Sequence, residues 1–222
     1  MAILRSIIFS LRSARRSRTN LWKNREGTAI LEFAIVGPAF IALLLAILYT
    51  VLIYLAQQML ETSAESAGRL LLTGSAQTMT LTNGHVGMQA SDYKDAICNG
   101  VSGTDASGQT VTIPSLLPSM LSCSRLTVNV TTTTTYNVAS TVSPTFTYNS
   151  SGVLTTTGSY NYQTNGSGKS HIVVLQLIYL LPTGKGPLGL NMIDEPNANH
   201  KLVATSVFTT EDYSCSASQT SC

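Results

Sequence analysis

The sequence has few charged residues. Only 11% of its 222 residues are Asp, Glu, Lys or Arg, against roughly 25% in an ordinary soluble domain. Residues 33–60 contain no charge at all, and the mean hydropathy of the chain is positive. This composition argues against a wholly water-soluble domain. It favours a membrane segment joined to an uncharged outer part.

Sequence signals for chemistry are also scarce. The three histidines (His85, His171, His200) are scattered and no Cys-x-x-Cys occurs, which argues against a zinc site. Residues 168–170 imitate the end of a phosphate-binding loop, but Gln163 stands where that loop needs glycine. No Gly-x-Ser-x-Gly motif is present. We therefore predict no enzyme activity and no catalytic, cofactor-binding or metal-binding residues.

The charges that do occur are divided unequally along the chain. Residues 1–27 carry seven basic residues against the single acid Glu26, whereas residues 28–222 carry six basic residues against ten acids. Lys and Arg beside a membrane helix stay on the cytoplasmic side, so the N-terminus is predicted to be cytoplasmic. A nucleic-acid-binding tail and a mitochondrial presequence are weaker alternatives, and we expect no nucleic-acid partner.

The apolar run is long enough to cross a membrane. Its core, residues 33–56, has 24 residues, and about 20 apolar residues span the hydrocarbon region of a bilayer. Trp22, Lys23 and Arg25 are predicted to anchor the inner boundary, and Tyr49 and Tyr54 lie toward the outer one. A cleaved secretory signal is a poor match, because its apolar part is about 7–15 residues long and ends at a small-x-small site.

A helical pattern continues beyond the membrane segment. Apolar residues recur at spacings of four, three and four, as on one face of a helix: Leu60, Ala64, Ala67 and Leu71. Gly74 is a natural stop. A helix over residues 28–72 would be about 68 Å long, and its outer stripe must pack against a folded domain.

That domain is predicted to be α+β. Residues 126–136, 172–181 and 202–209 have strand patterns, the second apolar enough to be a central strand covered on both faces. Ser91 is predicted to cap a short helix ending near Cys98. The sheet is expected to be three-stranded and antiparallel, covered by the long helix.

Polar loops complete the predicted domain. Residues 137–170 form an uncharged Ser/Thr-rich segment within the longer uncharged stretch 126–168. A solvated loop is the simpler interpretation of this stretch, and a functional loop is the alternative. Asp194 and Glu195 precede Pro196 and are predicted to lie in a solvated turn.

All four cysteines follow the membrane segment. They are Cys98, Cys123, Cys215 and Cys222, and an even number on the exported side indicates disulfides. Four cysteines allow three pairings. We favour Cys98 with Cys123, which ties the short helix to the first strand, and Cys215 with Cys222.

One motif stands where the basic leader meets the apolar run. It reads Gly27-Thr-Ala-Ile-Leu-Glu-Phe33, and a carboxylate inside a membrane helix is a functional hypothesis by default. Residues 25–38 resemble the Gly-x-Ala-x-x-Glu-Phe-Ala-x-x-x-Pro pattern of the TadE-like family, minor pilins or pseudopilins of tight-adherence (Flp-type) pili. The resemblance extends to residue 72.

The resemblance implies roles for several residues. A prepilin peptidase would cut between Gly27 and Thr28, and Glu32 would meet the new amine of a neighbouring subunit, with Phe33 beside it in the assembly. Alternatives are an uncut signal anchor and a Glu32 that only snorkels to the interface, about 8 Å from the helix start. Pro38 is expected to kink the helix.

The resulting expectation is a structural protein of pilus assembly. It would comprise a cytoplasmic leader (1–27), a membrane and extended helix (28–73) and a periplasmic domain (74–222), anchored once in the inner membrane and possibly incorporated in the pilus. Its expected partners are the inner membrane, other pilin-like subunits and a prepilin peptidase, with no cofactor. The alternative is an uncleaved, membrane-anchored binding or adhesion protein of the periplasm.

Overall fold

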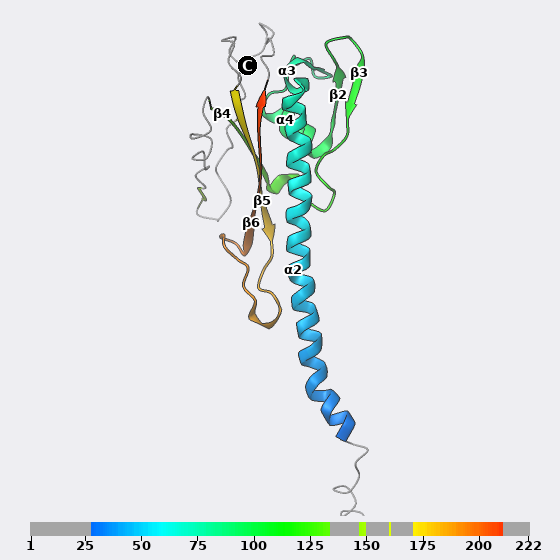
Figure 1. Cartoon of the computed structure of the whole chain (residues 1–222), viewed down its shortest axis with the longest axis vertical. Helices are drawn as coiled ribbons and strands as arrows, with labels where there is room; N and C mark the ends of the chain where they lie inside the picture. The colour runs from blue at the N-terminus through cyan, green and yellow to red at the C-terminus, as the bar shows by residue number, and fades with distance from the viewer. Residues whose placement is uncertain (1–27, 134–146, 150–159, 161–170, 211–222) are drawn as a thin grey trace, which may run out of the picture. The chain divides into compact units, whose positions relative to one another are not determined.

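The computed structural model describes residues 28–133, 147–149, 160 and 171–210 (Figure 1). The chain divides into two compact units, residues 1–48 and 49–222. Helix α2 (Thr28–Leu72) supplies residues to both units, and its bounds confirm the predicted long helix. Gly74 follows with φ of 75°, a left-handed conformation that glycine adopts without strain and that ends helices.

The predicted three-stranded sheet is confirmed. It consists of β4 (Leu126–Thr133), β5 (His171–Pro182) and β6 (Asn199–Thr210), in the order β4-β5-β6 with both pairs antiparallel. The register places Val128 and Ala204 on either side of Leu177. In Figure 1 this sheet lies alongside the upper part of α2.

The central strand β5 is buried on both of its faces. Alternate side chains on one face join the main core and are at most 2% exposed: Val173, Leu175, Leu177 and Tyr179. The apolar side chains on the opposite face, which flank a half-buried Gln176, are at most 8% exposed: Ile172, Val174, Ile178 and Leu180. Burying one such large aliphatic side chain is worth about 1.5–3 kcal/mol, so the nearly continuous apolar sequence of β5 is explained by cover on both sides.

The outer part of α2 covers the first of these faces. Its predicted apolar stripe is buried, with each member at most 2% exposed: Leu60, Ala64, Ala67 and Leu71. The small residues allow close packing. A Cβ atom placed on Gly68 would lie 3.1 Å from both the Phe208 ring and the Ser206 hydroxyl of β6, so β6 approaches α2 where the helix has no side chain.

A second sheet, which the sequence did not predict, lies between α2 and β4 in the chain. It contains β1 (Thr80–Leu81), β2 (Val101–Thr104) and β3 (Thr110–Ile113), in the order β1-β2-β3, all antiparallel. Its strands are two to four residues long, too short to show a periodic apolar pattern. Short helices accompany the two sheets in the described part of the chain: α3 (Ser75–Thr78), η2 (Cys123–Arg125) and η3 (Pro187–Gly189).

Helix α4 (Ala90–Asn99) confirms the predicted short helix but not its cap. The N-cap residue is Gln89 rather than Ser91. Asp92 stands three residues after Gln89 and its Oδ2 accepts a hydrogen bond from the Gln89 backbone N–H at 3.0 Å, as in a capping box. Tyr93 then fixes α4 to α2, because its hydroxyl donates to the Ala67 carbonyl at 2.8 Å.

The disulfide between Cys98 and Cys123 is confirmed. Their Cα atoms are 5.6 Å apart, and the bond joins the end of α4 to η2, immediately before β4. The other predicted pair, Cys215 and Cys222, lies outside the described residues. The basic leader and most of the uncharged segment 137–170 also lie outside them.

Candidate functional site

The first part of α2, residues 28–48, presents apolar side chains in all directions. Each of its large apolar residues is at least 44% exposed: Ile30, Leu31, Phe33, Ile35, Val36, Phe40, Ile41, Leu43, Leu44, Leu45, Ile47 and Leu48. A helix that is apolar all round belongs in a protein core or a bilayer. Since none of the residues that the structure describes covers these side chains, α2 has the properties of a single-pass membrane anchor.

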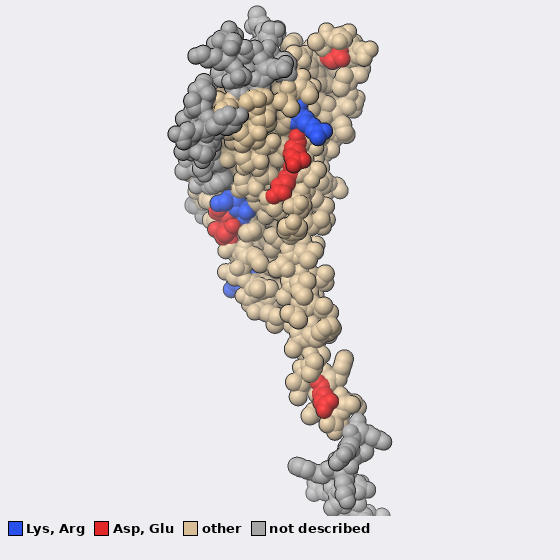
Figure 2. Space-filling view, in the orientation of Figure 1, with Lys and Arg blue, Asp and Glu red and all other residues tan. Residues whose placement is uncertain are grey.

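Glu32 lies within this apolar surface. It is exposed, and it is the only charged residue from position 28 to position 60. On the face drawn in Figure 2, one acidic patch interrupts an otherwise uncharged lower stretch. The next basic residue along α2 is Arg69, 37 positions away and therefore about 56 Å along the helix. A partner for this carboxylate within the bilayer must come from outside this helix.

The other predicted residues of the motif lie around Glu32. Thr28 is the first residue of α2, and Gly27 lies outside the described residues. Phe33 is 75% exposed, and its ring passes over Gly37, where an added Cβ would lie 3.6 Å from the ring. Pro38 lies inside the helix and removes one backbone hydrogen bond; its kink and the roles of the other motif residues stay predictions.

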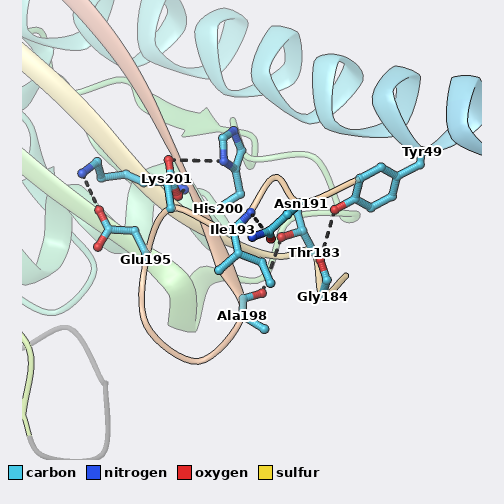
Figure 3. Close-up of polar contacts among 10 residues, drawn as sticks. Tyr49, Thr183, Gly184, Asn191, Ile193, Glu195, Ala198, His200 and Lys201 are labelled. Atoms are coloured by element: carbon cyan, nitrogen blue, oxygen red, sulfur yellow. Dashed lines mark hydrogen bonds and ion pairs between the residues drawn. The ribbon is translucent and has the colours of Figure 1, made fainter. Parts of the chain in front are cut away.

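A polar cluster that the sequence did not reveal lies in the loop between β5 and β6 (Figure 3). Glu195 forms an ion pair with Lys201. The neighbouring Asp194 accepts a hydrogen bond from the Lys201 backbone N–H at 2.9 Å, and its Oδ2 lies 3.3 Å from Nδ1 of His200. The Glu195 side chain is only 9% exposed. The prediction of a solvated turn is therefore wrong for Glu195.

Burial and the neighbouring positive charge shift the pKa of Glu195 in opposite directions. Burial alone would raise the pKa of its carboxyl group, but hydrogen bonds with Lys201 and Tyr148 and the Lys201 charge bring the pKa below its ordinary value. Burial, followed by the hydrogen bond and the charge of Glu195, raises the pKa of the Tyr148 phenol. The cluster stabilises the loop and the start of β6.

Within residues 28–133, 147–149, 160 and 171–210, no three His, Cys, Asp or Glu side chains are grouped so as to hold a metal ion. An open hollow of about 500 Å³ lies beside the disulfide, between Cys98 and Leu121. Its lining side chains are apolar, hydroxyl or amide groups and the disulfide itself, so it offers no group for acid–base work.

The exposed apolar part of α2, residues 28–48, with its single acid Glu32, is therefore the candidate functional feature. Residues 27–69 match the family model of the TadE-like protein. The match includes Gly27 and Glu32 and ends within α2, which confirms the resemblance drawn from the motif. No curated protein matches the chain, and no solved structure does. The TadE-like match supports a component associated with the Tad pilus.

Proposed function

We propose that this chain is a minor pilin or pseudopilin that takes part in building a tight-adherence, Flp-type pilus or a related secretion apparatus. The observation that carries the proposal is the lone carboxylate of Glu32 on the exposed apolar part of α2, inside the stretch that matches the TadE-like family. Such a helix can remain in the bilayer or pack with other apolar helices.

The physical argument concerns the cost of an unpaired charge. A carboxylate in a low-dielectric environment is unfavourable without a partner of opposite charge. Cleavage after Gly27 would create a positively charged amine on Thr28 of each subunit, four residues before Glu32. A neighbouring helix displaced along its axis by about 6 Å, four residues at 1.5 Å each, would bring the amine of one subunit level with Glu32 of the next.

Processing of the leader is the first test. Edman sequencing of the membrane-extracted protein is expected to begin at Thr28. The variant Gly27→Leu is expected to keep its leader and to be inactive in pilus assembly. A terminus at Met1 or Ala2 in the parent protein would contradict cleavage and favour the uncut anchor.

The charge of Glu32 is the second test. Glu32→Gln keeps the size of the side chain and removes the charge, and Glu32→Asp keeps the charge. We expect Glu32→Gln to reduce surface pili by about tenfold or more, the effect of losing about 1.4 kcal/mol at each subunit contact. Glu61→Gln, an exposed position later in α2, is the matched control. Normal piliation by Glu32→Gln would support simple snorkelling of this residue.

The proposed topology places the leader in the cytoplasm and the domain in the periplasm, anchored in the inner membrane. The basic leader and the disulfide between Cys98 and Cys123 support this orientation. Alkaline phosphatase fused after residue 210 should be active and a cytoplasmic reporter there inactive. Deletion of the gene should abolish piliation, whereas an anchored binding or adhesion protein would leave pili intact.

A further inference from the structure

The loop between β5 and β6, residues 183–198, has an exposed apolar tip. Its arms are paired by the Gly186 N–H, which donates to the Leu190 carbonyl at 2.8 Å, and by a bridge between Lys185 and Asn191. The short helix η3 (Pro187–Gly189) forms the tip. Residues 183–193 contain one basic residue, Lys185, and no acid. The tip is thus apolar with one positive charge.

Two contacts hold this loop against α2 at Tyr49 (Figure 3). The Tyr49 hydroxyl donates a hydrogen bond to the Gly184 carbonyl at 3.2 Å. The backbone of Gly186 lies so close to the ring that an added Cβ would be 2.8 Å from Tyr49 Cε1. Tyr49 and the loop belong to the same compact unit. The position of the loop along the helix is therefore fixed at Tyr49.

The exposed surface of α2 shows how deep Tyr49 lies in a bilayer. Exposed large apolar side chains continue beyond Tyr49 to Leu55, and the polar residues Gln57 and Gln58 follow. Residues 28–56 would measure about 43 Å along the axis, close to the roughly 40–45 Å thickness of a bilayer with its headgroups. Tyr49 then lies about 10 Å inside the outer edge, near the boundary between headgroups and hydrocarbon.

Leu188 gives the second, independent observation. Its side chain is 67% exposed, yet its backbone has φ of 57°, a left-handed conformation that is unfavourable for leucine and easy for glycine. In water, an exposed leucine side chain makes no contact that would offset the free-energy cost of this backbone conformation. Contact with lipid acyl chains would favour leucine at this position over glycine.

We propose that the tip of the β5–β6 loop inserts into the headgroup region of the phospholipid bilayer beside α2, with Leu188 at the hydrocarbon boundary and Lys185 at the lipid phosphates. This surface would orient the domain on the membrane before assembly. Apolar side chains anchor interfacial segments, and a lysine near anionic lipid adds an attraction that salt weakens. The inference rests on α2 being the membrane anchor, but not on the pilin role.

The test uses the full chain in vesicles of phosphatidylethanolamine and phosphatidylglycerol. The single tryptophan, Trp22, is replaced by Phe, and the reporter variants are Leu188→Trp and, as a control, Met120→Trp. Met120 is 59% exposed and lies in a different loop, before η2. Because interfacial side chains lie about 5–10 Å inside the membrane surface, brominated acyl chains are expected to quench the L188W tryptophan about twofold and leave the M120W tryptophan unchanged.

Flotation of the same vesicles distinguishes failure of the loop inference from failure of membrane anchoring by α2. If the protein floats with the lipid but L188W is quenched no more than M120W, the loop inference is wrong and the anchor stands. If the protein does not float, both are wrong. Lys185→Trp, at a second exposed position of the tip, provides another reporter if Leu188→Trp lowers the melting temperature; absence of quenching there overturns the proposal equally.

Discussion

The two parts of helix α2 are equally regular in secondary structure but differ in what surrounds them. In residues 28–48 every large apolar side chain is exposed, and in residues 49–72 the stripe from Leu60 to Leu71 is fully buried. The first part has bulky aliphatic and aromatic residues on all sides. The second has small residues on its buried side and polar residues such as Glu61 and Glu65 on the other.

This difference shows how one helix can serve two environments. Packing against a sheet requires small residues that let backbones approach, as Gly68 does beneath Phe208. Contact with a fluid apolar medium requires only a continuous apolar surface, since lipid adapts to the side chains. We therefore assign the stability of the domain to residues 49–72 and retention in the membrane to residues 28–48.

The largest expected difference comes from truncating leucine in each part. Leu60 in the second part is 0% exposed, and Leu48 in the first part is 57% exposed. Leu60→Ala is expected to lower the free energy of unfolding of the domain by about 2–5 kcal/mol, because it removes buried contacts and leaves a cavity. Leu48→Ala should change it by less than about 0.5 kcal/mol. Denaturant unfolding in detergent, followed by circular dichroism, measures both; equal losses would remove the distinction.

Removal of the disulfide should lower the stability of the domain and leave membrane anchoring unchanged. Replacing Cys98 and Cys123 together by Ser opens a link across 25 residues, which is expected to cost about 3 kcal/mol. The thermal melt of the domain reports this loss. Retention of the same variant in carbonate-washed membranes should be unchanged. Its release from the membrane would show that anchoring depends on the folded domain.

Replacing one glycine in each part of α2 by valine compares how tightly the two parts are packed. At Gly68 an added Cβ already lies 3.1 Å from Phe208 and Ser206, so Gly68→Val should cost about 1–3 kcal/mol through overpacking. At Gly37 the nearest atoms belong to Phe33, at an ordinary 3.6 Å. Gly37→Val is expected to leave domain stability unaltered. Domain melting temperatures measured in the same detergent decide between these outcomes.

The smallest expected effect is a pH dependence that belongs to the domain alone. The pKa of Glu195 in the folded state lies below its ordinary value of 4.5, so its ionised form favours folding above that pH. As the pH falls through the folded-state pKa, the carboxylate takes up a proton and this contribution is lost.

Urea unfolding at a series of acidic pH values checks this dependence. Glu195→Gln should lose less stability than the parent when the pH is lowered past 4.5. Glu65→Gln, at an exposed position of α2, should behave like the parent. Parallel curves for the parent and Glu195→Gln would mean that the ion pair with Lys201 contributes nothing.

The main elements of this fold could be predicted because their signals are long and local. Helix α2 and the strands of the β4-β5-β6 sheet each have an apolar pattern over eight or more residues. The disulfide between Cys98 and Cys123, which was favoured among three possible pairings, is present. The short strands β1, β2 and β3 gave no such signal, since pairing across turns, rather than side-chain periodicity, defines them.

Helix caps and side-chain contacts were harder to predict from the sequence than the helices and strands themselves. Ser91 is a favourable cap residue by type, but Asp92 accepts the hydrogen bond from the Gln89 backbone N–H, and the cap of α4 lies two residues earlier than predicted. Glu195 and Lys201 are six positions apart and meet only because the backbone reverses between them. That reversal uses Asn197 and Ala198 with φ of 60° and 57°, and a left-handed alanine has no recognisable sequence signal. The roles of Gly27, Thr28, Glu32 and Phe33 stay predictions that only experiments on assembly can test.

Extraction of the full chain from native membranes tests whether residues 28–48 occupy a bilayer. Membranes are washed with high salt and alkaline carbonate and then floated through a sucrose gradient. If residues 28–48 occupy the bilayer, the protein remains with the floating lipid after both washes. Recovery of the folded protein in the soluble fraction would contradict the account, because the exposed apolar surface of α2 would then need another protein to cover it.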